Sequence, residues 1–318
     1  MSSATRVAVT GAGGFIGRAL VAKLNSAGWK VVPLQRRRHG MANEIVVGPL
    51  EDAAPIPDLE VDVFVHLAAH RGLGGKRENG QAGLLLANSE ATKSSIEIAH
   101  AAGARRFVFL SSVKAVGETS PPKTIISCET EPKPTSAYGR SKLESERLVE
   151  ENCRRLGMEW TIIRPPMVYG PGAGGNFKAL VRLARIPLPL PFGATSNARS
   201  LVFVGNLADF IRFCALADTA ADQTFLVADG EPISTKQMLA ELAEAQGRTA
   251  RFVAFPPVLV WRALALFGRQ AIAERLFGDL AVDMSDARQA GWEPPFSRRE
   301  AFEIAVGKRD ASVDDPCP

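Results

Sequence analysis

The chain begins with a short strand, a glycine-rich turn and a helix, and this succession constrains the fold more than any other feature. Arg6–Thr10 is rich in apolar and β-branched residues, which predicts a buried strand. Glycines at positions 11, 14 and 17 allow a tight turn, close approach of a phosphate to the backbone, and packing of the helix on the strand. The helix N-terminus also favours an anion. We therefore expect a dinucleotide pyrophosphate here, contacted by Gly11, Gly14, Phe15, Ile16 and Gly17; a flexible glycine loop is the alternative.

Strand-like and helical segments alternate through about residue 165. The expected strands are Arg6–Thr10, Lys30–Leu34, Val61–Leu67, Phe107–Leu110 and Trp160–Ile163, and the expected helices are Phe15–Ala27, Leu84–Ala102 and Ala137–Leu156. Such alternation predicts an α/β fold, a Rossmann-type doubly wound parallel sheet with helices on both faces.

Proline and glycine cluster after Arg164 and mark a change in organisation. Beyond them, Leu201–Val204 and Thr224–Val227 read as strands that could return to the sheet, and the chain from Glu231 is mostly helical. We expect a dinucleotide-binding domain at residues 1–165 plus about 200–230. A smaller, mostly helical substrate domain takes residues 166–199 and 231–307, and residues 308–318 form a tail.

The composition disfavours several other classes of protein. A net charge of +4, without a basic stretch interleaved with aromatic residues, suits anionic ligands but does not predict nucleic-acid binding. The four cysteines (Cys128, Cys153, Cys214 and Cys317) stand far apart, and no C-x-x-C pair occurs. We expect no metal site, no disulfide framework and a cytoplasmic location.

The most apolar segment is Phe252–Phe267, which contains Pro256, Pro257 and Arg262. It is too short and too interrupted to span a bilayer. We expect a packed helix of the C-terminal region, with a role at a membrane surface as the alternative.

A phenol and an ammonium group, Tyr138 and Lys142, stand four residues apart, on one face of a predicted helix. A neighbouring Lys⁺ favours a phenolate, so Tyr138 could exchange a proton with a hydroxyl or carbonyl group. The buried strand Phe107–Leu110 ends at Ser111 and Ser112, and catalytic groups in such sheets sit at carboxyl ends of strands. Ser112 is the expected partner of the reacting oxygen; helix capping or turn formation is the alternative for both serines.

The second expected strand ends at Gln35, followed by Arg36, Arg37 and Arg38. NAD sites usually place an acid here against the ribose 2′-OH. Guanidinium groups instead bind a 2′-phosphate in bidentate fashion. NADP(H) is therefore favoured and NAD(H) remains possible. A solvated charge run is the alternative for one or two of the arginines.

Taken together, the motifs resemble the NAD-dependent epimerase/dehydratase family, the extended short-chain dehydrogenases, over nearly the whole chain. The motifs that carry the resemblance are Thr10-Gly11-x-x-Gly14-x-x-Gly17, His66-Leu67-Ala68-Ala69, Asn88, Ser111-Ser112, Tyr138-x-x-x-Lys142 and Arg164-Pro165-Pro166-x-Val168-Tyr169-Gly170-Pro171. Within the family, the chain is most similar to UDP-glucose 4-epimerase-like proteins and to nucleotide-sugar 4-ketoreductases of surface-polysaccharide pathways.

The resemblance implies roles for individual residues. Tyr138, Lys142 and Ser112 match the catalytic triad. Cofactor contacts are implied for Gly11, Gly14, Phe15, Ile16, Gly17, Gln35, Arg36, Leu67, Ala68, Ala69, Asn88, Ser111, Tyr138, Lys142, Pro165 and Val168. Substrate contacts are implied for Ser112, Asn176, Arg199 and Arg275, with a helix cap and a surface charge as the alternatives for Asn176 and Arg199. Pro49 stands where the family often has an aspartate near adenine, which leaves that contact in doubt.

Val113 and Lys114 follow Ser112 where dehydratases and decarboxylases of the family carry carboxylates. Water elimination needs an acid and a base beyond the tyrosine, so both reactions are disfavoured. We expect NADP(H)-dependent reduction of a 4-keto group on a nucleotide-linked sugar, in a homodimer without a membrane span. The alternatives are a 4-epimerase with tightly bound NAD and a non-catalytic NADP sensor.

Overall fold

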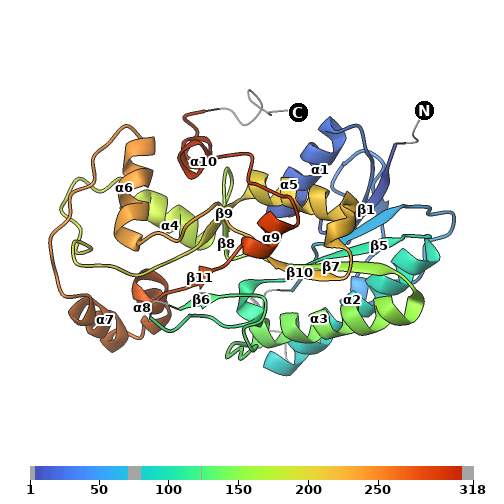
Figure 1. Cartoon of the computed structure of the whole chain (residues 1–318), viewed down its shortest axis with the longest axis horizontal. Coiled ribbons are helices and arrows are strands. Elements are labelled where there is room, and N and C mark those ends of the chain that lie inside the picture. Colours follow the sequence, from blue (N-terminus) through green and yellow to red (C-terminus); the bar gives the residue numbers. More distant parts are fainter. Residues whose placement is uncertain (1–3, 71–79, 123, 310–318) are drawn as a thin grey trace.

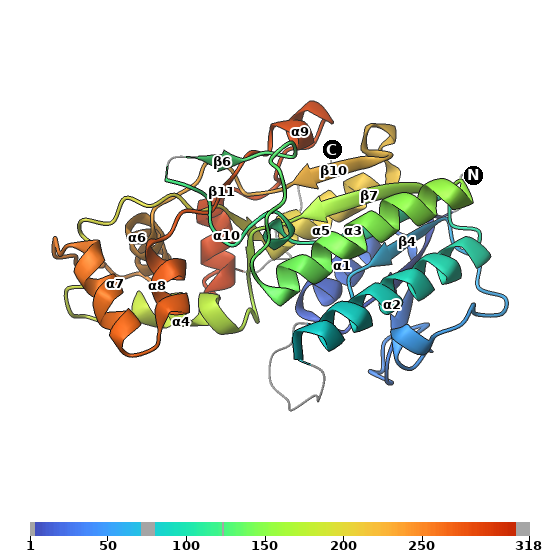
Figure 2. The same cartoon turned by 90° about the horizontal axis from the view of Figure 1, so that it is seen from below.

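The computed structural model describes residues 4–70, 80–122 and 124–309, and its centre is a seven-stranded sheet (Figures 1 and 2). All of its pairings are parallel. The order across the sheet is β10 (Gln223–Leu226), β7 (Glu159–Arg164), β5 (Arg106–Leu110), β4 (Val63–His66), β1 (Arg6–Thr10), β2 (Lys30–Gln35) and β3 (Ile45–Val46). The strand order reverses beside β1, as in doubly wound sheets, so the predicted fold class is confirmed.

Helices cover both faces of this sheet. On one face α1 (Phe15–Ser26) packs against α5 (Val204–Leu216), and on the other α2 (Gly80–Ala101) packs against α3 (Ala137–Leu156). The five residues of β5 are all buried. Because successive side chains point to opposite faces, a strand covered on both sides needs a continuous apolar run, which Phe107–Leu110 supplies. Arg106 at the start of the strand is buried as well and pairs with Glu159.

The rest of the chain forms a smaller lobe at the other end of the long axis, next to the carboxyl ends of the strands (Figures 1 and 2). It contains two two-stranded sheets, β8 (Met167–Tyr169) with β9 (Leu201–Phe203) and β6 (Ile125–Ile126) with β11 (Ala281–Val282). Its helices are α4 (Gly175–Leu183), α6 (Thr235–Ala245), α7 (Pro257–Leu266), α8 (Gln270–Phe277) and α10 (Arg298–Ala305), while the short α9 (Ser285–Gln289) contacts β10 of the main sheet. In the described part of the chain, short 3-10 turns occur next to the main sheet and its helices at η1 (Leu50–Asp52), η2 (Val113–Ala115) and η3 (Asp218–Ala220).

One of the two expected returning strands does not join the main sheet. β10 returns to the main sheet, where it pairs with β7, but β9 pairs with β8 in a separate sheet. The reason is that the chain leaves the main sheet at the carboxyl end of β7. β8 and β9 therefore pair with each other outside that sheet. The tail expected at residues 308–318 lies mostly outside the described residues.

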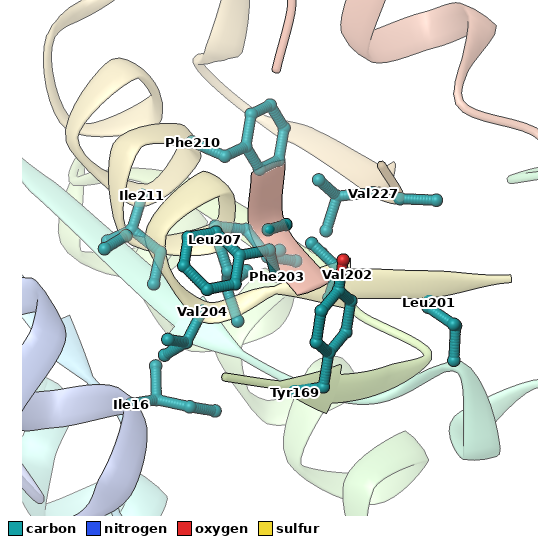
Figure 3. Close-up of a cluster of buried hydrophobic side chains, with 14 of the residues drawn as sticks. Ile16, Tyr169, Leu201, Val202, Phe203, Val204, Leu207, Phe210, Ile211 and Val227 are labelled. Atoms are coloured by element: carbon teal, nitrogen blue, oxygen red, sulfur yellow. The ribbon is translucent and has the colours of Figure 1, made fainter. Parts of the chain in front are cut away.

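Buried apolar side chains join the two parts of the molecule (Figure 3). Ile16 of α1, Tyr169 of β8 and Val204 of α5 belong to one continuous core cluster with β9. Burial of this apolar surface favours a fixed arrangement of the small lobe against the sheet.

The packed helix expected in the C-terminal region forms as α7, but large apolar side chains at its end are exposed. Leu266 is 87% exposed and Phe267 is 81% exposed. Among the helices of the described residues, none is long and apolar enough to span a membrane.

Candidate active site

The glycine turn has the close geometry that the sequence predicts. Gly11 adopts a φ of +70°, and a Cβ atom there would lie 2.9 Å from the backbone nitrogen of Ala68. A Cβ atom on Gly17 would clash with the carbonyl oxygen of Gly11. Gly14 is the N-cap of α1, so the first backbone N–H groups, those of Phe15 and Ile16, have no intrahelical acceptor. The turn can therefore present N–H donors to a phosphate group.

The segment after β4 is held beside this turn by buried polar contacts. Thr10 Oγ1 lies 2.9 Å from His66 Nδ1 and accepts a hydrogen bond from the Ala68 backbone nitrogen at 3.4 Å. Burial, reinforced by the charge of Lys142, lowers the pKa of His66 to about 3, so the ring is neutral at pH 7. On either side of Ala68, Leu67 is half-buried and Ala69 is exposed.

Asn88 of α2 ties this segment to helix α3. Its Oδ1 accepts from the His70 backbone nitrogen at 2.8 Å, and its Nδ2 donates to the His70 carbonyl oxygen at 3.1 Å and to Ser141 Oγ at 3.0 Å. The side chain therefore fixes the backbone of His70, the residue directly after Ala69.

The three predicted catalytic residues lie at the carboxyl end of β5 and on the first turns of α3, which packs against η2. Ser112 caps η2, its Oγ accepting from the Lys114 backbone nitrogen at 3.3 Å. Lys142 is only 3% exposed, and its ammonium group donates to the Leu110 carbonyl oxygen at 2.8 Å. Tyr138 is half-buried one turn before Lys142. The helix thus carries its phenol and ammonium to the end of the strand that bears Ser112.

Glu118 anchors the N-terminus of α3, and the sequence reasoning missed it. It accepts from Thr135 Oγ1 at 2.6 Å, from both backbone nitrogens of Thr135 and Ser136, and from Ser136 Oγ. Ser136 Oγ in turn accepts from the Gly139 backbone nitrogen at 3.0 Å. Burial alone would raise the pKa of Glu118, but these hydrogen bonds lower it. The carboxylate positions the turn that carries Tyr138.

Glu146 is a second residue that the sequence reasoning missed. It lies one turn after Lys142 on α3 and pairs with Arg164 of β7, with contacts of 3.0 Å to Nε and 2.7 Å to Nη2. Ser111 Oγ also hydrogen-bonds to Glu146. Burial opposes the charge of Arg164, but the hydrogen bonds and charge of Glu146 raise its pKa. The hydroxyl of Ser111, one of the expected cofactor contacts, thus belongs to a buried network with Glu146 and Arg164.

The end of β2 carries an amide and then exposed guanidinium groups. Gln35 is buried, with Nε2 donating to Met41 Sδ at 3.1 Å. A Cβ atom on Gly13 would lie 3.4 Å from this amide, so Gln35 borders the glycine turn. Arg36 is exposed and follows directly. Arg38 turns toward Glu44, 3.9 Å away.

The structure brings together the three expected substrate residues in the small lobe. Arg275 of α8 donates to Asn176 Oδ1 at 3.0 Å, and Asn176 lies in the first turn of α4. Arg199 donates to the Gly278 carbonyl oxygen at 2.9 Å. Burial lowers the pKa of Arg199 to about 10; Asp279 raises it and the charge of Arg275 lowers it. Arg199 and Arg275 repel each other, and Arg275 is bonded to a residue in the first turn of α4. This gathering of positive charge is suited to an anion.

Pro165 and Val168, the remaining expected cofactor residues, lie where the chain leaves the sheet. The Pro165 carbonyl oxygen accepts from the Val113 backbone nitrogen at 3.0 Å, and Val168 lies in β8.

Comparisons with known proteins agree with this geometry. Residues 7–228 match the model of the NAD dependent epimerase/dehydratase family. A UDP-glucose 4-epimerase of Vibrio cholerae is 35% identical over 313 residues, which cover 93% of each chain.

Two solved structures have the same fold. A short-chain dehydrogenase/reductase superfamily protein from Agrobacterium tumefaciens with bound NAD has a TM-score of 0.73 and 23% identity, covering 96% of this chain and 97% of that one. MoeE5 in complex with UDP-glucuronic acid and NAD has a TM-score of 0.72 and 25% identity, covering 95% and 97%. The sheet, its glycine turn and these likenesses define an NAD(P)-dependent oxidoreductase or epimerase of the extended short-chain dehydrogenase type. The chain belongs to the NAD-dependent epimerase/dehydratase family.

Proposed function

We propose that this protein reduces the 4-keto group of a nucleotide-linked sugar, a UDP-sugar of surface-polysaccharide biosynthesis, with NADPH as the reductant. The observation that carries the proposal is the end of β2, where Gln35 borders the glycine turn and exposed Arg36 follows. An amide and a guanidinium group can donate hydrogen bonds to a ribose 2′-phosphate, whereas a carboxylate would repel it. NADP is held mainly in its reduced form in the cell, and a reductase consumes one reduced cofactor for each 4-keto group that it reduces.

The residues at the end of β5 would supply the proton for this reaction. A bound nicotinamide would donate hydride to C4 of the sugar. Tyr138 would donate its phenolic proton to the developing O4 alkoxide, while Lys142 stabilises the phenolate that remains. Ser112 would hydrogen-bond O4 and orient it toward Tyr138. The cofactor would lie along Gly11–Gly17, Ala68 and Pro165.

Dehydration is disfavoured in this proposal because the acid and base it needs are missing beside Ser112. Val113 and Lys114 follow the serine, and the carboxylate of Glu118 is occupied by hydrogen bonds to Thr135 and Ser136. A reductase needs only one proton donor, which Tyr138 provides.

The small lobe would hold the nucleotide-sugar diphosphate. Asn176, Arg199 and Arg275 come from three separate segments. Arg275 binds Asn176 in the first turn of α4, and Arg199 adds a second positive charge that Arg275 repels. In this division, residues 1–165 with about 200–230 bind the dinucleotide, and residues 166–199 and 231–307 bind the substrate.

We further propose a cytoplasmic homodimer that associates through α2 and α3. Leu85 and Leu86 of α2 are 36% and 61% exposed and offer apolar surface for the contact. Cys128, Cys153 and Cys214 are free thiols, which suits a reducing compartment.

A nucleotide-sugar 4-epimerase with tightly bound NAD is the second candidate, and the relative from Vibrio cholerae is the observation that favours it. An epimerase would use the same Tyr138 to remove and return one proton, without net consumption of reduced cofactor.

The deciding experiment incubates the purified protein with UDP-4-keto-6-deoxy-N-acetylglucosamine and follows the absorbance of NADPH. Loss of NADPH in proportion to the sugar reduced is the expected result. Interconversion of UDP-glucose and UDP-galactose without loss of NADPH would establish the epimerase instead. Titration with NADPH and NADH tests the cofactor: tighter binding of NADH would overturn the role given to Arg36.

A further inference from the structure

The outer end of the small lobe exposes an unusual amount of apolar surface. Of the fourteen large apolar side chains that are exposed in the described part of the chain, nine lie within residues 186–188 and 253–272. The most prominent are Val253, Phe255, Val258, Leu259, Leu266 and Phe267. We call this group, with the segments that carry it, the distal surface.

The parts of the distal surface lie next to one another in the fold. Backbone hydrogen bonds from Leu190 to Arg251 (2.8 Å) and from Val253 to Leu190 (3.0 Å) pair the two loop segments. Helices α7 and α8 pack together at the end of the long axis farthest from the main sheet (Figures 1 and 2). Exposed apolar patches of this kind mark interaction sites.

The same surface is cationic. Arg185, Arg251, Arg262 and Arg269 are exposed within or beside it. Between Gly247 and Gly278 the sequence contains one acidic residue, Glu274, and between Glu159 and Asp209 it contains none. The segments that carry the exposed apolar side chains therefore hold several exposed arginines and a single acidic residue of their own.

We propose that the distal surface docks on an anionic lipid bilayer. Phe255, Leu266 and Phe267 would enter the boundary between headgroups and acyl chains, while Arg262 and Arg269 would meet the lipid phosphates. Short amphipathic helices with arginine beside exposed Leu and Phe bind membrane interfaces in this way. The ten residues of α7 lie on the bilayer rather than cross it.

Charge also argues against a second copy of this chain as the occupant. In a two-fold symmetric contact the same patch meets itself, so the arginines of one copy would face those of the other. An anionic bilayer offers both an apolar interior and the opposite charge.

Sedimentation with vesicles tests the proposal. The protein should pellet with vesicles made of equal parts phosphatidylglycerol and phosphatidylcholine, but not with pure phosphatidylcholine. The double variant Leu266→Glu with Phe267→Glu should weaken this binding at least about tenfold. Because both side chains are more than four-fifths exposed, its thermal unfolding should be unchanged.

The matched control is Val46→Glu with Leu216→Glu, which adds the same two charges at exposed apolar positions outside the distal surface. This control should pellet almost as well as the unchanged protein. If both double variants bind anionic vesicles equally weakly, the loss of binding follows from the change in net charge rather than from the distal surface, and the proposal is overturned. So would a failure of the unchanged protein to pellet with anionic vesicles. A self-association that only the Leu266/Phe267 variant loses, without any change in pelleting, would assign the surface to a second copy.

Discussion

The two ends of the molecule hold their functional side chains in different ways. At the end of β5, Lys142 is buried, and its ammonium group donates to the carbonyl oxygen of Leu110. At the far side of the site, Arg275 is exposed and is held to Asn176 by a single side-chain hydrogen bond. The sheet therefore fixes a proton donor rigidly, while the small lobe presents binding groups that are free to adjust. A reaction centre needs that rigidity more than a diphosphate site does.

The largest effect should come from the rigid end. Tyr138→Phe removes the only group proposed to donate the proton, and we expect turnover to fall about a thousandfold. Cofactor binding should stay nearly unchanged, because the ring remains. Turnover and cofactor affinity are measured side by side. A fully active variant would remove Tyr138 from the mechanism and with it the contrast between the two ends.

The next effect tests what makes that end rigid. Glu146→Gln leaves the guanidinium of Arg164 buried without a full counter-charge, which should lower the free energy of unfolding by about 3 kcal/mol. Glu144→Gln is the matched control on the same helix, where the pair with Arg147 is exposed, and it should cost less than about 1 kcal/mol. Denaturant unfolding measures both.

A double replacement separates charge from packing in this prediction. Glu146→Leu with Arg164→Met should recover most of the lost stability, because neither variant side chain is an unpaired charge. If Glu146→Gln lowers the free energy of unfolding no more than Glu144→Gln does, the buried ion pair is not what holds α3 against β7.

The sequence predicted the rigid end well, and the physical reason is local. β1 and α1 follow from an apolar run and a glycine turn that are contiguous in the chain. The phenol and ammonium of Tyr138 and Lys142 share a face simply because helices repeat every 3.6 residues. β7 and α3 likewise lie within a few residues of their predicted limits.

What the sequence missed depends on neighbours that are distant along the chain. Glu146 gains its role only because β7 lies beside β5, which brings Arg164 under α3. The hydrophobic pattern predicts that β9 is a strand, but it does not predict which strand β9 pairs with. The pairing with β8 rather than with the main sheet therefore could not be read from the sequence. The exposure of Leu266 and Phe267 is of the same kind, since an apolar helix predicts burial until its surroundings are known.

The third prediction compares the pH response of the two regions. The folded-state pKa of His66, about 3, lies below the ordinary value of about 6.5, so the unfolded chain binds more protons as the pH falls between these values. This buried ring should therefore lower the free energy of unfolding by about 2 kcal/mol at pH 5 relative to pH 7.

Asp229, where the small lobe meets the sheet, should act in the opposite direction. Burial raises its pKa to about 6, although hydrogen bonds from the Phe203 backbone and Asn206 lower it, so the folded protein takes up this proton first. His66→Asn should flatten the loss of stability on acidification, and Asp229→Asn should steepen it. Urea unfolding at pH 7, 6 and 5 measures the slopes, and parallel slopes for the two variants would refute the contrast.

The smallest effect should come from the adjustable end. Arg275→Ala removes the guanidinium group that donates to Asn176, and we expect KM for the nucleotide sugar to rise about tenfold with kcat nearly unchanged. The reason is that this contact is as strong in the ground state as in the transition state. Arg269→Ala, an exposed arginine at the start of the same helix, is the control and should leave both constants as they are with a water-soluble substrate. Steady-state kinetics separate the outcomes. A fall in kcat for Arg275→Ala would mean that the small lobe also sets the position of the reacting carbon, and the division between a rigid centre and an adjustable binding site would then have to be drawn elsewhere.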